Sequence, residues 1–171
     1  MNLADYLRDV PDFPAPGIVF KDISPLLADH GAFAAAVEAM AAPFEDQGVT
    51  SVVGIEARGF LFGPPIAQHL GIGFVPVRKP GKLPGAVVGL DYDLEYGTDR
   101  IELLANAIGT GDRVLAVDDV LATGGTLEAA CALIGQTGAV VGGISVLVEL
   151  VALNGRAKLP DVRISAPIEV N

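Results

Sequence analysis

The sequence predicts an α/β fold, in which helices flank a mainly parallel central sheet. Two observations lead to this prediction. Short apolar runs rich in β-branched residues alternate along the chain with longer stretches that carry helical signals. The apolar runs are continuous rather than interleaved with polar residues, as expected of strands that are buried on both faces. Strands that alternate with helices favour parallel pairing, because a helix returns the chain to the edge where the next strand begins.

The first expected elements are a helix, a strand and a second helix. Residues 32–44 are rich in alanine and predict a helix, with Asp29 as its N-cap. Residues 49–55 read as a buried strand because β-branched residues dominate them. Residues 64–70 predict a helix with its two prolines in the first turn, where a missing N–H group is harmless.

The later elements continue the alternation. Residues 74–78 read as a strand, and Pro76 places it at an edge of the sheet, because proline cannot donate a hydrogen bond to a neighbouring strand. Residues 113–117, R-V-L-A-V, follow a glycine-containing turn and read as another strand. The remaining expected elements are a helix at residues 126–136 and strands at residues 140–147 and 162–165.

Composition limits the classes of protein that remain. The chain has 171 residues, 51% of them apolar, which suits one domain over residues 1–171 and is too apolar for a disordered chain. With 11 Lys and Arg against 21 Asp and Glu, the formal charge is −10, which argues against nucleic acid or a membrane surface as a partner. A single Cys excludes an internal disulfide and a cysteine-rich zinc site. With no signal-peptide pattern and no apolar run of about 18 residues, we expect a cytoplasmic protein.

The expected sheet indicates where to look for a binding site. In parallel sheets of this kind, ligands bind beyond the carboxyl ends of the strands. Residues 56–59, 79–84 and 118–126 each follow an expected strand, and each contains glycine and at least one charged residue. We therefore expect these segments to hold the functional side chains.

The most informative segment is residues 114–126, V-L-A-V-D-D-V-L-A-T-G-G-T, which reads as a strand, two acids, a loop of small residues and the start of a helix. At the start of a helix several backbone N–H groups lack partners, and the helix dipole favours an anion there. Gly124 and Gly125 let the backbone come close to that anion, while Thr123 and Thr126 add hydroxyl donors. The segment predicts a site for a phosphate monoester.

Two adjacent acids, Asp118 and Asp119, precede this loop. Their carboxylates suit ribose hydroxyls, or a metal ion shared with them, so a ribose 5-phosphate unit would satisfy both halves of the segment. An ordinary strand-to-helix turn would explain the glycines alone but not the whole string. Two common nucleotide fingerprints, G-x-G-x-x-G after a strand and G-x-x-x-x-G-K-[ST], are missing.

The whole string resembles the phosphoribosyl-diphosphate motif of the type I phosphoribosyltransferases. Three further segments resemble parts of one group within them, the adenine phosphoribosyltransferase family. Residues 13–25, F-P-A-P-G-I-V-F-K-D-I-S-P, resemble its base-binding segment, and residues 56–63, E-A-R-G-F-L-F-G, its diphosphate-binding loop. Residues 78–97, which include R-K-P-G-K-L-P and Y-D-L-E-Y-G, resemble its mobile catalytic loop. The likeness extends over residues 13–149.

The resemblance implies a fold and a reaction. The fold would be that of type I phosphoribosyltransferases, with an N-terminal base-binding hood and a mobile catalytic loop beside the sheet. The reaction would convert adenine and 5-phosphoribosyl 1-diphosphate into AMP and diphosphate, a step of purine salvage. Mg²⁺ would take part and be held mainly by the substrate, without a side-chain ligand that we can assign. A homodimer is the implied assembly.

The resemblance also implies roles for residues around the ribose and its phosphate groups. Asp118 and Asp119 would meet the ribose hydroxyls, and one of them would stabilise the cation that develops on the ring. Arg58 would reach the diphosphate, in a loop completed by Gly59 that often contains a cis peptide in this superfamily. The 5′-phosphate would be cradled by Ala122, Thr123, Gly124, Gly125 and Thr126. Further charge for the diphosphate would come from Arg78, Lys79 and Lys82, in part from a neighbouring subunit.

The base would be bound by Val19, Phe20 and Val120. Phe20 offers a face for purine stacking, and the backbone N–H and C=O at Val19 match an amino-pyrimidine edge, as in adenine. Glu95 would hold or exchange the N7 proton of the base, and Tyr96 would help to close the mobile loop. The implied catalytic residues are Glu95, Asp118, Asp119 and Arg58.

Other functions stay open at this stage. A phosphoribosyltransferase for another base would share the ribose-phosphate loop, and residues 13–25 are the feature that favours adenine over it. A regulator that senses phosphoribosyl diphosphate and binds nucleic acid should carry a basic face or a DNA-binding module, and the sequence has neither. A relic that binds the ligand without turnover should have lost some of the implied catalytic residues.

The charges are distributed unevenly along the chain. Residues 57–90 contain no Asp or Glu but four basic residues, so they carry +4 and the other residues carry −14. The overall acidic balance is therefore compatible with binding a small anion locally. Residues 98–102 follow the family pattern, but we assign them no chemistry, and residues beyond 150 carry no informative motif.

Overall fold

The central element of the computed structural model, which describes residues 1–94 and 97–171, is a parallel sheet with the strand order β4–β3–β7–β8–β10. Strand β9 also pairs with β8, and each pairing recorded within this sheet is parallel. The strands span Ser51–Ile55 (β3), Gly73–Val77 (β4), Arg113–Leu121 (β7), Val140–Leu150 (β8), Ile164–Ser165 (β9) and Ile168–Val170 (β10).

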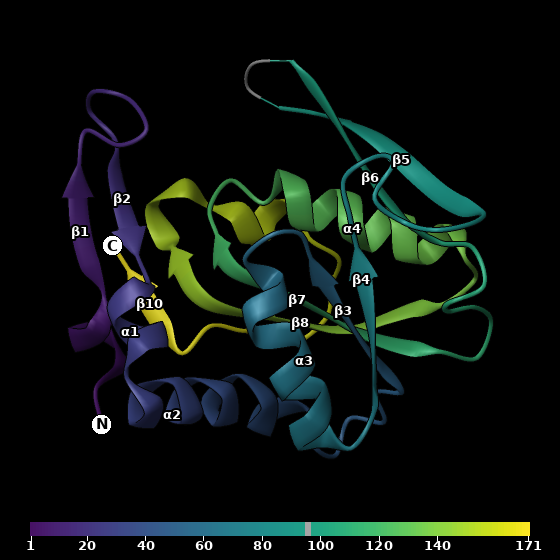
Figure 1. The fold of residues 1–171 in the computed structure, drawn as a ribbon, viewed down its shortest axis with the longest axis horizontal. Coiled ribbons are helices and arrows are strands. Elements are labelled where there is room, and N and C mark those ends of the chain that lie inside the picture. Colours follow the sequence, from purple (N-terminus) through teal and green to yellow (C-terminus); the bar gives the residue numbers. More distant parts are fainter. Residues whose placement is uncertain (95–96) are drawn as a thin grey trace.

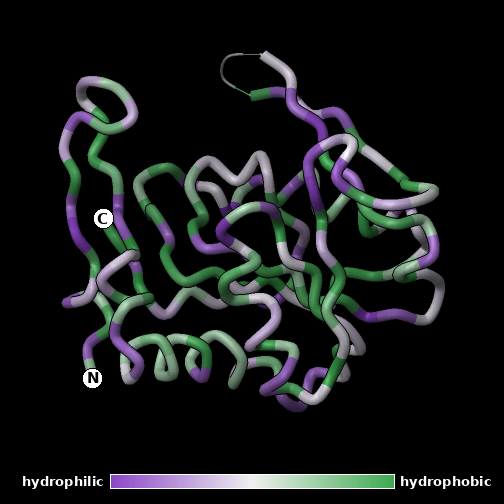
Figure 2. The backbone as a smooth tube through the Cα atoms, viewed as in Figure 1, coloured by the Kyte–Doolittle hydropathy of each residue, from purple (hydrophilic) through white to green (hydrophobic). Residues whose placement is uncertain are grey.

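Helices cover both faces of this sheet, as Figure 1 shows. In β7, Leu115 and Val117 face a core that includes residues of the first three helices, while Val114 and Ala116 face a second core that includes α4. Figure 2 shows the central strands as largely apolar. The predicted α/β fold with a sheet buried on both faces is therefore confirmed. The helices span Ser24–Ala28 (α1), His30–Ala41 (α2), Gly59–Leu70 (α3) and Gly125–Gln136 (α4).

Two antiparallel hairpins stand apart from the main sheet. Strands β1 (Arg8–Pro11) and β2 (Val19–Asp22) form the first, and β5 (Val87–Asp93) and β6 (Thr98–Leu104) form the second. Figure 1 shows the end of β1 and the end of β5 on the same side of the molecule. The sequence analysis did not predict either hairpin, because their short and partly exposed strands lack the continuous apolar runs of the central sheet. Short 3₁₀ helices span Leu3–Tyr6 (η1), Ala42–Phe44 (η2), Val151–Leu153 (η3) and Gly155–Lys158 (η4).

The predicted start of the helix at residues 64–70 is wrong. Helix α3 begins at Gly59, so Pro64 and Pro65 lie inside it rather than in its first turn. Each proline lacks the N–H group that would bond to the carbonyl four residues earlier. The helix nevertheless continues across both prolines and ends at Gly71, which adopts a left-handed conformation with φ 68°.

The strand predicted at residues 113–117 is too short, because β7 continues to Leu121. Its pairing with β8 continues as well, and Asp118 lies opposite Val146. Asp118 and Asp119 are therefore inside the strand rather than in a loop beyond it. The other predicted strands agree with β3, β4, β8 and β9 to within three residues, and the Pro76 strand lies at an edge, as predicted.

The remaining helix predictions are largely confirmed. Helix α4 starts one residue earlier than predicted, and α2 is followed by the 3₁₀ turn η2, so that together they cover the predicted residues 32–44. The carboxylate of Asp29 accepts a hydrogen bond from the N–H of Ala32 at 2.8 Å, which confirms it as an N-cap. No helix in the described part of the chain is both long and apolar enough to span a membrane.

Two adjacent residues of α3, one buried and one exposed, test which face of this helix packs against the rest of the protein. The Phe62 side chain is fully buried and its ring centroid lies 5.8 Å from that of Phe33 in α2, whereas Leu61 is 41% exposed. We expect Phe62→Ala to lower the free energy of unfolding by about 3–5 kcal/mol, because it leaves a cavity between helices and sheet. Leu61→Ala should change it by only about 0.5 kcal/mol. Denaturation in urea measures the free energy of unfolding of both variants. Equal losses of stability would show that α3 packs differently.

Candidate active site

A cavity of about 230 Å³ lies where β7 passes into α4. The carboxyl end of β3 adjoins it, because β3 and β7 pair side by side and in parallel. We call this space the loop cavity. It is lined by Arg58, Asp118, Asp119, Val120, Leu121, Ala122, Thr123, Gly124, Gly125, Thr126 and Leu127. The structure thus brings together the residues predicted for the 5′-phosphate, the acidic pair and Arg58.

The amino end of α4 opens into this cavity. Gly124 precedes the helix in a left-handed conformation with φ 86°, which favours glycine strongly over other residues. No described side chain caps this end of the helix. The first backbone N–H groups of α4 are therefore available to an anion, and the helix dipole favours one there.

The two acids form the polar wall of the loop cavity. The N–H of Asp119 donates to Oδ1 of Asp118 at 2.9 Å. Nε of Arg58 lies 2.9 Å from Oδ2 of Asp119, close enough for an ion pair, but the two groups are not aligned for a hydrogen bond. Burial raises the pKa of both carboxyl groups, and the charge of Asp119 raises that of Asp118 further, while Arg58 opposes the shift.

Gly59 allows the loop after β3 to approach these acids. A Cβ atom at this position would lie 2.8 Å from the carbonyl oxygen of Val117 and 3.2 Å from Oδ1 of Asp118. Only glycine therefore fits without displacing the backbone of β7. The Glu56–Ala57 peptide in the same loop is cis.

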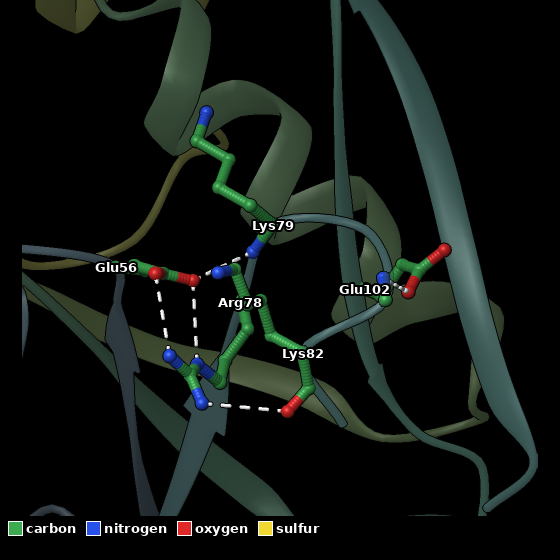
Figure 3. A network of polar contacts seen from close by, with 6 residues as sticks. Glu56, Arg78, Lys79, Lys82 and Glu102 are labelled. Atoms are coloured by element: carbon green, nitrogen blue, oxygen red, sulfur yellow. Dashed lines mark hydrogen bonds and ion pairs between the residues drawn. The ribbon is translucent and has the colours of Figure 1, made fainter. Parts of the chain in front are cut away.

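Glu56 holds the beginning of the predicted catalytic loop, as Figure 3 shows. Its carboxylate accepts hydrogen bonds from Nε and Nη2 of Arg78, each at 3.3 Å, and from the backbone N–H of Lys79 at 2.8 Å. The Lys79 N–H bond, assisted by Arg78, lowers the pKa of Glu56. Lys82 takes part through its carbonyl oxygen, which accepts from Nη1 of Arg78 at 3.4 Å. In this structure the Arg78 guanidinium therefore faces Glu56.

The Lys79 side chain points instead toward a second cavity, of about 260 Å³, which also borders Arg58 and the acidic pair. We call it the lysine cavity. The ammonium group of Lys79 forms an ion pair with Asp99, and the hydroxyl of Tyr92 lies 3.2 Å from the same carboxylate. The bond from Lys79 lowers the pKa of Asp99. Arg78 and Lys82 do not line this cavity.

Asp99 and Tyr92 are site residues that the sequence analysis missed. Asp99 lies in residues 98–102, to which we assigned no chemistry, and Tyr92 had no role in the prediction. Asp99 could have been identified from the antiparallel register of the second hairpin, because this register places Asp99 opposite Tyr92.

The residues predicted to bind the base are distributed over more than one surface. Val19 lines an open groove of about 1050 Å³, which lies between the first hairpin, the end of β5 and the residues after β8. Phe20 contacts Phe13 edge to face, with ring centroids 5.2 Å apart, and the guanidinium of Arg58 lies 4.9 Å from its ring centroid. Val120 lines the loop cavity instead. Glu95 and Tyr96 lie outside the described residues.

The oxygen atoms available at this site can be compared with those that the implied Mg²⁺ requires. Among residues 1–94 and 97–171, no three His, Cys, Asp or Glu side chains gather closely enough to hold a metal ion. Asp118 and Asp119 nevertheless supply the carboxylate oxygens that Mg²⁺ prefers. Two carboxylates cannot complete a shell of six oxygens, so these residues fit an ion whose other ligands are substrate oxygens and water.

Comparison with known proteins connects this site to a family. Residues 26–166 match the model of the phosphoribosyl transferase domain. The adenine phosphoribosyltransferase of Streptomyces coelicolor is 57% identical over 167 residues, which cover 98% of this chain and 92% of that protein. The crystal structure of the adenine phosphoribosyltransferase of Thermoanaerobacter pseudethanolicus is similar with a TM-score of 0.95 and 47% identity, covering 98% of both chains.

A further structure contains ligands. The adenine phosphoribosyltransferase of Saccharomyces cerevisiae, solved in complex with adenine and D-2,5-dideoxy-2,5-imino-altritol 1,6-bisphosphate, matches with a TM-score of 0.91 and 41% identity over 96% of both chains. These relatives cover nearly the whole chain, including both hairpins and the loop cavity. The chain therefore belongs to the adenine phosphoribosyltransferase family.

Proposed function

We propose that residues 1–171 form a single catalytic domain that transfers the 5-phosphoribosyl group of 5-phosphoribosyl 1-diphosphate to adenine, yielding AMP and diphosphate in purine salvage. One observation carries this proposal: a single cavity joins an uncapped helix end, two carboxylates and an arginine. These groups match, in order, the 5′-phosphate, the ribose hydroxyls and the diphosphate of that substrate.

The 5′-phosphate binds to residues 122–126 at the start of α4. Backbone N–H groups and the hydroxyls of Thr123 and Thr126 donate to its oxygens, so no lysine is needed there. Asp118 and Asp119 precede this loop in β7, and their carboxylates accept hydrogen bonds from the ribose hydroxyls. The end of the strand thus holds the ribose hydroxyls, and the loop that follows holds the 5′-phosphate.

The diphosphate binds at the opposite side of the acidic pair. Arg58, which is not aligned to bond with Asp119, keeps its donors available to the diphosphate, and Gly59 keeps the loop close. Lys79 adds a second cation from the lysine cavity. Arg78 and Lys82 supply further charge only after rearrangement or to a neighbouring subunit, and we propose that the chain forms a homodimer.

The reaction is a displacement at the anomeric carbon. The bond from N9 of adenine to this carbon forms, the bond to the diphosphate oxygen breaks, and the electron pair leaves with the diphosphate. Positive charge develops on the ribose ring, and the carboxylates of Asp118 and Asp119 stabilise it. Mg²⁺, when bound with the substrate, neutralises charge on the departing diphosphate. Adenine reacts as the tautomer with its proton on N7, so that N9 carries the free electron pair, and Glu95 takes the N7 proton as the new bond forms. Closure of the mobile loop, with Tyr96 over the site, keeps water away.

Base selection rests on the first hairpin. Phe20 provides an aromatic face for the purine, and the backbone of Val19, which lines the groove, reads the edge of the base. A backbone N–H and C=O pair matches the ring nitrogen and amino group of adenine. An oxopurine would present a carbonyl to that C=O and an N–H to that N–H, leaving both unpaired at a cost of about 1–3 kcal/mol each. Val120 closes the site from β7.

The proposed specificity predicts the result of a base panel. Purified protein with 5-phosphoribosyl 1-diphosphate and Mg²⁺ should form AMP from adenine, with kcat/KM at least about 100-fold above that for hypoxanthine, guanine or xanthine. Product analysis by chromatography measures each rate. Efficient product formation from an oxopurine without AMP from adenine would contradict the proposal.

Removal of the Arg58 guanidinium should reduce transition-state stabilisation. We expect Arg58→Ala to lower kcat/KM by about 10²–10³, because a positioned cation no longer meets the charge that develops on the diphosphate. The matched control is Arg163→Ala, which removes an exposed guanidinium that donates to the carbonyl of Pro43 at 3.1 Å. Steady-state kinetics distinguish them, and similar activities for the two variants would remove Arg58 from the site.

The acidic pair should lower the stability of the ligand-free protein. Asp118 has a pKa raised above 3.8, so its ionised form destabilises the fold, and this penalty is present above the raised pKa and lost as the pH falls through it. We expect Asp118→Asn to be inactive but more stable by about 1–3 kcal/mol at pH 7, with the gain vanishing toward pH 3.8. Urea denaturation across pH, without Mg²⁺ or substrate, measures this. A pH-independent difference would show that the pKa of Asp118 is not raised in the folded protein.

A further inference from the structure

A turn after β8 lies directly behind the phosphate loop, residues 122–126. Gly155 begins the 3₁₀ helix η4 and is buried. A Cβ atom on Gly124 would lie 2.5 Å from the carbonyl oxygen of Gly155, and one on Gly155 would lie 2.3 Å from the carbonyl oxygen of Ala122 and 3.2 Å from the N atom of Gly124. Two backbone segments therefore touch at a point where neither tolerates a side chain.

The next residue along, Arg156, ties this turn to the sheet. Nε of Arg156 donates to both carboxylate oxygens of Glu149, at 2.8 and 2.9 Å, and Nη2 donates to Oε2 at 2.6 Å. Nη1 lies within hydrogen-bond distance of the carbonyl of Ile164, at 3.3 Å. The Glu149 side chain is only 6% exposed, which makes this the most enclosed carboxylate among the ion pairs of the described residues apart from that of Asp119.

Glu149 lies beside the end of the strand that leads into the phosphate loop. In β8 it is paired with Leu121, the last residue of β7 before the phosphate loop. The Glu149–Arg156 pair therefore links the strand beside the loop entrance to the turn behind the loop. No other described arginine makes three hydrogen bonds to one carboxylate.

We infer that Glu149, Gly155 and Arg156 form a rear clamp that holds the phosphate loop in the shape that binds the 5′-phosphate. The inference rests on the proposed function, and it assigns positioning roles to residues that do not line the loop cavity. A loop of small residues loses much conformational freedom on binding, and a fixed support reduces that cost in advance. The clamp supports only the 5′-phosphate end of the substrate, because its contacts are with Ala122 and Gly124 and not with the Arg58 loop.

The test compares ligands that occupy opposite ends of the site. Ribose 5-phosphate requires the phosphate loop, whereas diphosphate requires Arg58 and Lys79. Calorimetry on the wild-type protein and on Gly155→Ala, Arg156→Lys and Glu149→Gln gives a Kd for each ligand. Gly155 has no positive φ, so alanine is disfavoured there by space alone. The matched control is Gly135→Ala in α4, where a Cβ atom would meet nothing within 4 Å.

We expect the clamp variants to raise the Kd for ribose 5-phosphate by about ten-fold or more, because small displacements of a positioned group are costly. Their Kd for diphosphate should change less than about two-fold, and Gly135→Ala should change neither. Arg156→Lys keeps the charge without the planar fork, so it tests the clamp even if Gly155→Ala does not fold. An unchanged Kd for ribose 5-phosphate, or equal losses for both ligands, would overturn the inference. If the wild-type protein binds neither ligand, the proposed function itself fails.

Discussion

Strands β3 and β7 lie side by side at the centre of the sheet, with Ser51–Gly54 opposite Val114–Val117. This parallel pairing brings the loop that carries Arg58 and the strand that carries the acidic pair to the same edge. Gly59 then lets the two backbones approach so closely that a Cβ atom at this position would lie 2.8 Å from the carbonyl oxygen of Val117. Without this contact, a cation and two carboxylates from distant parts of the sequence would not share one cavity. The phosphate loop, both hairpins and the turn at Gly155 are arranged around it.

The proposed site carries little uncompensated positive charge for an anion. The basic residues between positions 57 and 90 suggest a cationic patch, but Arg78 faces Glu56 and Lys79 faces Asp99. Arg58 is close to Asp119. What remains for a phosphate is mainly the amino end of α4, whose partial charge comes from peptide dipoles rather than side chains. A protein of formal charge −10 can therefore hold a highly charged substrate through local geometry.

Much of the fold could be predicted from the sequence, because the central strands are buried on both faces and their residues are continuously apolar. The phosphate loop could also be predicted, since glycine, threonine and the preceding acids lie within one short string. The hairpins could not, because strands such as β1 and β5 are half exposed and depend on pairing rather than on hydrophobic pattern. The predicted start of α3 is wrong because proline is most common in the first turn of a helix. Here the packing of Phe62 and its neighbours maintains the helix around Pro64.

The sequence by itself determined the family motifs, the alternation of the central strands with helices, and the local chemistry of residues 118–126. Each of these depends on residues that are close along the chain. The tertiary structure alone decided that Arg78 pairs with Glu56, that Asp99 contacts both Lys79 and Tyr92, and that Gly155 lies against Gly124. The contacts of Arg78, Lys79 and Gly155 join residues about 20 or 30 positions apart, and that of Gly155 is between two backbones. Their existence depends on how the strands pair, which no local pattern specifies.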